Sequence, residues 1–188
     1  MHMPNLERHW TFDDLEELPD DGNRYEIIDG ELFVTPAPSL RHQEAIAQLH
    51  HILASYLSRH RVGHAFFAPA DIVFSPRRAV QPDIIVLPLV DGRRPETFIE
   101  VNRRLLLAAE ILSPSTARAD RVAKRMLFRE EGVAEYWVVD LDARAVERAT
   151  PGDSRSEIFA DHLEWFPDGA AEPLVIDVPV YFAQVLDA

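Results

Sequence analysis

Two apolar segments that each carry one acidic residue constrain the fold of this chain more than any other feature. One segment covers residues 83–87 and opens with Asp83, and the other covers residues 105–112 and holds Glu110 near its end. Short apolar runs of this kind are typical of strands buried on both faces in the middle of a sheet. A charged carboxylate is costly to bury there unless it meets a cation, a hydrogen-bond donor or solvent. The two acids therefore indicate a functional site.

The sequence around these segments predicts further helices and strands, and with them an α/β (α+β) fold. Asp29-Gly30 is the strongest two-residue signal for a hairpin turn. Ser39 is a suitable N-cap for a long helix that Gly63 ends. The expected elements are a short helix at 10–18, hairpin strands at 25–28 and 31–35, a helix from Ser39 to Arg61, strands at 64–74, 83–87 and 105–112, a helix at 117–131 that turns Val122, Met126 and Leu127 inward, strands at 135–140, 145–149 and 174–176, and a short final helix after Pro179.

Composition bounds the class of protein. The 188 residues, 47% of them hydrophobic, predict a single domain over 1–188 with its core at about 10–187. No apolar run approaches the roughly 18 residues that a membrane span needs, and charges near the start argue against a signal peptide, so we expect a cytoplasmic protein with no membrane contact. Cysteine is absent, which excludes disulfides and thiolate chemistry. The net charge of -13 argues against nonspecific coating of nucleic acid.

The two acids suit a particular chemistry if their strands are neighbours. Paired carboxylates form a hard oxygen site for Mg²⁺ or Mn²⁺, and such a site suits phosphodiester hydrolysis. Lys124 is the only lysine among 19 lysine and arginine residues, and lysine offers a compact charge with a movable pKa that arginine lacks. The plainer alternatives are that Asp83 caps a turn after Pro82 and that Lys124 forms a surface pair with Asp120.

Six short motifs follow one another along the chain, and together they resemble one known family. They are YEIIDGE at 25–31, Ser39 with Arg41-His42, QPD at 81–83, EILSPST at 110–116, Asp120 with Lys124, and GVAEYWVVD at 132–140. This set resembles the Uma2 family, also called the domain of unknown function 820 family. The motifs are specific in combination and weak singly.

The resemblance implies both a fold and a site. Uma2 proteins are similar in fold to the PD-(D/E)XK nucleases, which implies a restriction-endonuclease-like core: a central mixed β-sheet flanked by helices, with an N-terminal β-hairpin. It also implies that Asp83 and Glu110 are Mg²⁺ ligands. The usual nuclease pattern has a lysine two residues after the second acid, where this chain has Leu112. The Uma2 pattern takes the lysine from the following helix, which corresponds to Lys124.

Several other residues are candidates for the same site. The Ile111 carbonyl is expected to complete the metal shell, and Glu31 is a possible third acid or else a solvated hairpin residue. His42 and Ser113, both within the matching motifs, are candidates for substrate binding, and the alternative role for His42 is to hold the hairpin. Arg118, Arg121 and Arg125 share one helix face by spacing, either as phosphate contacts or as a solvated face.

Three functions remain open at this point. The leading hypothesis is a Mg²⁺-dependent DNA endonuclease in which Lys124 orients or helps deprotonate the attacking water. The second is a non-catalytic module that binds nucleic acid or protein on a nuclease scaffold, and the third is a hydrolase of a smaller phosphodiester. Nucleases that cut both strands often act as symmetric pairs, so a homodimer is expected.

Overall fold

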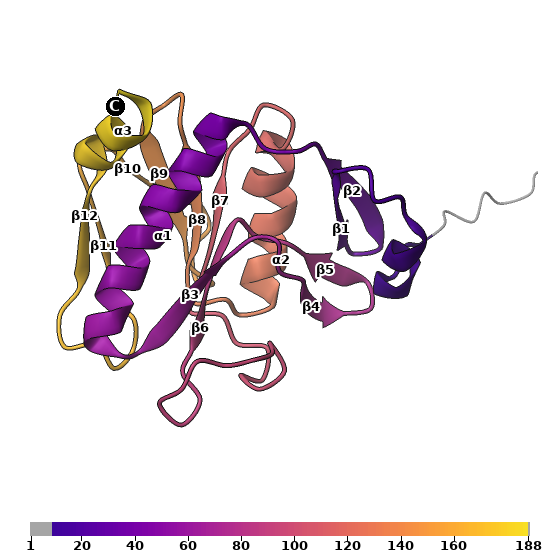
Figure 1. Ribbon diagram of the computed structural model, residues 1–188, viewed down its shortest axis with the longest axis horizontal. Coiled ribbons are helices and arrows are strands. Elements are labelled where there is room, and N and C mark those ends of the chain that lie inside the picture. The colour runs from indigo at the N-terminus through magenta and orange to yellow at the C-terminus, as the bar shows by residue number, and fades with distance from the viewer. Residues whose placement is uncertain (1–8, 188) are drawn as a thin grey trace, which may run out of the picture.

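A six-stranded mixed sheet forms the centre of the computed structural model, which describes residues 9–187 (Figure 1). Its strand order is β10-β9-β8-β7-β6-β3. Only β7 and β8 run parallel, and the other neighbours are antiparallel. The bounds are β3 Gly63–Phe67, β6 Ile84–Pro88, β7 Leu107–Ile111, β8 Tyr136–Asp140, β9 Ala145–Ala149 and β10 Glu157–Phe159. The expected central strands around Asp83 and Glu110 are therefore confirmed.

A second, four-stranded antiparallel sheet lies beside the first and is ordered β2-β1-β5-β4 (Figure 1). Its hairpin confirms the Asp29-Gly30 turn. Asp29 has φ 53° and Gly30 has φ 85°, the pair of positive angles that a type I′ turn requires. The bounds are η1 Phe12–Glu17, β1 Arg24–Ile28, β2 Glu31–Thr35, β4 Ile72–Ser75 and β5 Arg78–Val80.

The single strand expected at 64–74 is wrong, because the chain divides there between the two sheets. Residues up to Phe67 form β3 of the large sheet, and those from Ile72 form β4 of the small one. Pro69 lies between them and has no backbone N–H to donate to a ladder. Apolar residues lie on both sides of the break and Ala68 and Ala70 lie within it, so the hydrophobic pattern does not reveal it.

Two helices cover one face of the large sheet (Figure 1). The Ser39 side chain accepts a hydrogen bond from the His42 backbone N–H at 3.2 Å, as expected of an N-cap. The first helix ends at His60, and the next residue, Arg61, takes the left-handed conformation expected of Gly63. Gly63 begins β3 instead, where a Cβ would lie 2.8 Å from the Leu87 carbonyl oxygen. The elements on this side are α1 Leu40–His60, α3 Val178–Leu186 and the strand pair β11 His162–Trp165 and β12 Leu174–Asp177.

The second helix differs from the expected one in its winding. Ala117 and Arg118 are α-helical, the next turn is the π-helical segment η2 Ala119–Lys124, and the helix continues as α2 Arg125–Glu130. The wider π turn changes which side chains face inward. Val122 and Met126 are 52% and 49% exposed, which corrects their expected inward placement, whereas Leu127 is buried as expected.

The large sheet separates two apolar cores. Ile84, Ala109 and neighbouring alternate residues face α1 and α3, while Ile85 and Ala108 face α2 and the small sheet. Ile84 pairs with Ala109 in the β6–β7 register. Asp83 immediately precedes β6 and Glu110 follows Ala109 in β7, so the two acids lie side by side at this end of the sheet. Within residues 9–187, none of the helices combines the length and the apolar character that crossing a bilayer requires.

Candidate active site

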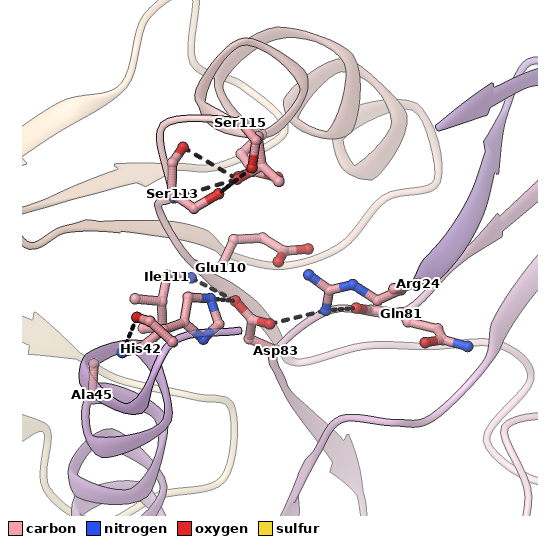
Figure 2. A network of polar contacts seen from close by, with 12 residues as sticks. Arg24, His42, Ala45, Gln81, Asp83, Glu110, Ile111, Ser113 and Ser115 are labelled. Atoms are coloured by element: carbon pink, nitrogen blue, oxygen red, sulfur yellow. Dashed lines mark hydrogen bonds and ion pairs between the residues drawn. The ribbon is translucent and has the colours of Figure 1, made fainter. Parts of the chain in front are cut away.

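Asp83 and Glu110 meet at one end of the central strands. Their side chains are buried, with 2% and 1% exposure. The Asp83 Oδ2 atom accepts a hydrogen bond from the backbone N–H of Ile111 at 2.8 Å, so its carboxylate reaches the strand that carries Glu110 (Figure 2). Both acids therefore belong to one cluster, as the apolar strand patterns predicted.

Two basic side chains hold the Asp83 carboxylate. Arg24 Nη1 lies 2.9 Å from Oδ1, and His42 Nε2 lies 3.2 Å from Oδ2 (Figure 2). Burial alone would raise the pKa of Asp83, but His42, Arg24 and the Ile111 N–H outweigh it and lower that pKa to about 2. Asp83 is therefore a stable carboxylate anion. The two roles suggested for His42, substrate contact or support of the hairpin, are joined by a third, which is orientation of Asp83.

Lys124 lies at the centre of a buried group of acids. Its Nζ is 2.7 Å from Glu110 Oε1, 2.9 Å from Glu26 Oε2 and 3.5 Å from Asp120 Oδ1. The pairing with Asp120 is real, but both side chains are buried, so the surface-pair interpretation is wrong. Burial lowers the pKa of Lys124, yet the three carboxylates outweigh it and raise that pKa above its usual value. The raised pKa favours the ammonium form of Lys124, which can donate hydrogen bonds to these carboxylates.

Acidic side chains outnumber permanently cationic ones in this cluster. Four carboxylates, those of Glu26, Asp83, Glu110 and Asp120, surround the two permanent cations Arg24 and Lys124. Burial raises the pKa of Glu110 well above its usual value despite the opposing charge of Lys124, and burial likewise raises the pKa of Asp120. A further positive charge at this place would lower the pKa of both Glu110 and Asp120.

The donor chemistry fits a small divalent cation. Mg²⁺ is commonly held by one or two carboxylates with its remaining positions filled by other oxygens. Residues 9–187 contain no group of three or more His, Cys, Asp or Glu side chains placed to hold a metal ion. A cation here would therefore rely on Asp83, Glu110, a backbone carbonyl such as that of Ile111, and water.

The sequence analysis missed Glu26 and Arg24. Both lie on β1 with one residue between them, so their side chains share a face that turns toward the cluster. Glu26 Oε1 accepts a hydrogen bond from the Gln81 backbone N–H at 2.7 Å, while Oε2 contacts Lys124. A signal was present, because Glu26 is an acid beside apolar Ile27 and Ile28, much as Glu110 is an acid inside an apolar strand.

Glu31, the acid proposed from sequence as a third member, is not in this cluster. It is exposed and pairs in register with Ile28 beside the hairpin turn. Arg24 pairs with Thr35 at the opposite end of the same hairpin. The third and fourth acids of the cluster are Glu26 and Asp120, because strand pairing turns Glu26 inward and leaves Glu31 at the solvated turn.

The three arginines of the second helix do not form one free patch. Arg121 donates hydrogen bonds to Asp140 at 2.6 Å and to Glu147 at 2.7 Å. Arg125 donates to the backbone oxygen of Asp153 at 3.3 Å, and Arg118 is exposed. The π-helical winding separates side chains that regular α-helical spacing would align.

A cavity of about 930 Å³ opens beside Asp83. Ser113 lines it and lies with its Oγ 3.0 Å from the hydroxyl oxygens of Ser115 and Thr116 (Figure 2). Three members of the acid cluster, Glu26, Glu110 and Lys124, are not among the residues that line this cavity. Other lining residues are Arg24, Arg41, His42, Phe67, Arg121, Asp140 and Asp142.

The central mixed sheet with its flanking helices is a restriction-endonuclease-like fold. The family model of Uma2, described as "putative restriction endonuclease", matches residues 12–171, and the chain belongs to that family. The structure is similar to the crystal structure of a "putative nuclease belonging to DUF820" from Anabaena variabilis, with a TM-score of 0.75 and 22% identity over 94% of this chain and 99% of that one. At this identity the likeness shows the fold alone. No curated protein matches.

Proposed function

We propose that this protein is a metal-dependent endonuclease that hydrolyses phosphodiester bonds in DNA. The observation that carries the proposal is the buried Lys124 ammonium, 2.7 Å from Glu110 and on the same end of the sheet as Asp83. Two acids on adjacent strands with a lysine beside them is an arrangement that suits hydrolysis of a phosphodiester. Family membership supports the same class of reaction.

Each residue of the cluster has a distinct proposed role. Asp83 and Glu110 would hold Mg²⁺ or Mn²⁺, with the Ile111 carbonyl as a further ligand. When bound, the ion would neutralise charge at the phosphate and lower the pKa of a water molecule. Lys124, kept protonated by its carboxylates, donates a hydrogen bond that orients the attacking water. Of the two roles that the sequence left open for Lys124, the raised pKa favours orientation over deprotonation.

Two observations favour the other candidate functions. The net charge of -13 and the pairing of Arg121 with two acids favour a module that binds a partner without cutting it. The cavity of about 930 Å³ is large enough for a small phosphodiester. A binding module, however, has no need of an ammonium group buried among three carboxylates, which is costly to maintain. For this reason we retain the nuclease as the principal proposal.

A plasmid-cleavage assay tests the proposal. The parent protein should cut DNA in Mg²⁺ or Mn²⁺, stop in a chelator and work poorly in Ca²⁺, whose looser coordination geometry places water less well for attack. Asp83→Ala and Lys124→Ala should abolish cutting. Asp142→Ala, which removes an 87%-exposed acid of the same cavity, is the matched control and should retain it.

The same assay separates the alternatives. RNA and a small phosphodiester are run as competing substrates. Conversion of plasmid directly to linear product would indicate that two copies act together, as expected for a homodimer. Cutting that persists in both site variants would reveal a contaminating nuclease, and no cutting of any substrate in any ion would favour the binding module.

A further inference from the structure

Arg24 occupies the space beside both proposed metal ligands. Its Nη1 donates hydrogen bonds to Asp83 Oδ1 at 2.9 Å and to the Gln81 backbone oxygen at 2.7 Å. Figure 2 shows the guanidinium group next to the carboxylates of Asp83 and Glu110. Burial lowers the pKa of Arg24, but the charges of Glu110, then Asp83, then Glu26 outweigh it and raise that pKa. Arg24 is therefore a permanent cation held by the same acids that a metal ion would use.

Arg24 comes from a different part of the fold than the two proposed metal ligands. Asp83 and Glu110 belong to the large sheet or its ends, whereas Arg24 comes from β1 of the small sheet. Its side chain also lines the cavity beside Asp83 and is 18% exposed. A guanidinium group in this place can bind a phosphate as well as a carboxylate.

We propose that Arg24 is the resident cation of this site, neutralising Asp83 and Glu110 in the metal-free protein and competing with a divalent ion for them. The proposal rests on the metal site proposed above. Without Arg24, the basic partners of these buried acids among residues 9–187 would be Lys124 and His42. The guanidinium group therefore stabilises the metal-free fold. The consequence is weak metal binding, because an ion must displace the bond between Arg24 and Asp83.

Calorimetric titration of Mn²⁺ into the metal-free protein tests this competition directly. Arg24→Ala should bind Mn²⁺ about tenfold more tightly than the parent, the change expected when one charge-assisted hydrogen bond no longer has to be broken. Arg24→Gln should show a similar gain, and it keeps a hydrogen-bond donor for Gln81 if the alanine variant fails to fold. Arg41→Ala is the matched control. Arg41 lines the same cavity, but its acidic partner is Asp142, at 3.7 Å, and its removal should leave Mn²⁺ affinity unchanged.

Added guanidinium gives a second readout that does not depend on activity. At a non-denaturing concentration it should refill the space in Arg24→Ala and weaken Mn²⁺ binding again, with little effect on the parent. Equal Mn²⁺ affinities in the parent and both Arg24 variants would overturn the role of Arg24. If Asp83→Ala abolishes binding in that case, the proposed metal site survives. Absence of Mn²⁺ binding in the parent and in every variant would overturn both proposals.

Discussion

Lys124 Nζ and Glu110 Oε1 lie 2.7 Å apart, although the two residues come from a helix and a strand. The topology explains the contact. Because β7 and β8 are parallel neighbours, the segment between them must cross over one face of the sheet. That crossover is η2 with α2, and it brings Lys124 to the face on which Glu110 lies. Leu112, the position at which the usual PD-(D/E)XK pattern has its lysine, is partly buried and packs against the apolar core instead.

Replacement of Lys124 by arginine should abolish most of the proposed activity. Arginine keeps the charge, but its planar guanidinium group cannot take the place of a compact ammonium among three carboxylates. We expect DNA cleavage to fall by about 10²-fold or more, the range associated with a positioned proton donor. Cleavage rates of Lys124→Arg and of Arg129→Lys, a change at an exposed position of the same helix, check this. Parent-like cleavage by Lys124→Arg would mean that charge alone is sufficient.

The burial of two adjacent side chains in α2 predicts that their removal has different effects on stability. Leu127 is 1% exposed and Met126 is 49% exposed. Leu127→Ala should therefore lower the free energy of unfolding by about 2–5 kcal/mol, whereas Met126→Ala should change it by less than about 0.5 kcal/mol. Urea denaturation of both variants measures the difference. Similar losses at the two positions would contradict the burial that the structure gives these two side chains.

Glu135 provides a pH-dependent prediction outside the site. Burial raises the pKa of its carboxyl, although a hydrogen bond from Trp137 Nε1 at 2.8 Å opposes this. A raised pKa in the folded state means that the proton is held more tightly there, so stability decreases as pH rises above the unfolded value of 4.5. Glu135→Gln, which keeps an acceptor for Trp137, should raise the free energy of unfolding at pH 7 and leave it nearly unchanged at pH 4. A loss at pH 7 would show that the charged form is favoured.

The salt dependence of DNA binding should distinguish two arginines of one helix. Arg118 is exposed, whereas Arg121 already binds Asp140 and Glu147. In the Asp83→Ala background, which prevents cutting, Arg118→Ala should reduce the slope of log affinity against log salt by about 1. Arg121→Ala should reduce it by less, because phosphate would first have to displace two acids. Fluorescence anisotropy with a labelled duplex measures both slopes, and equal reductions would refute the distinction.

The sequence by itself determined the central strands and their acids. Apolar residues flank Glu110 and follow Asp83 without interruption, and burial on both faces of a sheet is the condition that favours such runs. The Asp29-Gly30 turn and the Ser39 cap were equally predictable, because each depends on the conformation or hydrogen bonding of neighbouring residues alone.

Only the tertiary structure decided which other residues join these acids. Glu26 and Arg24 reach the cluster because β1 packs beside the end of β6, a contact between segments more than fifty positions apart in the chain. Glu31 differs from Glu26 only in its place on the hairpin, and strand register leaves it exposed. The π-helical turn likewise sets which helix residues are buried. Local sequence patterns predict the conformation of each segment. The pairing of charges between distant segments depends on how those segments pack together, which no local pattern specifies.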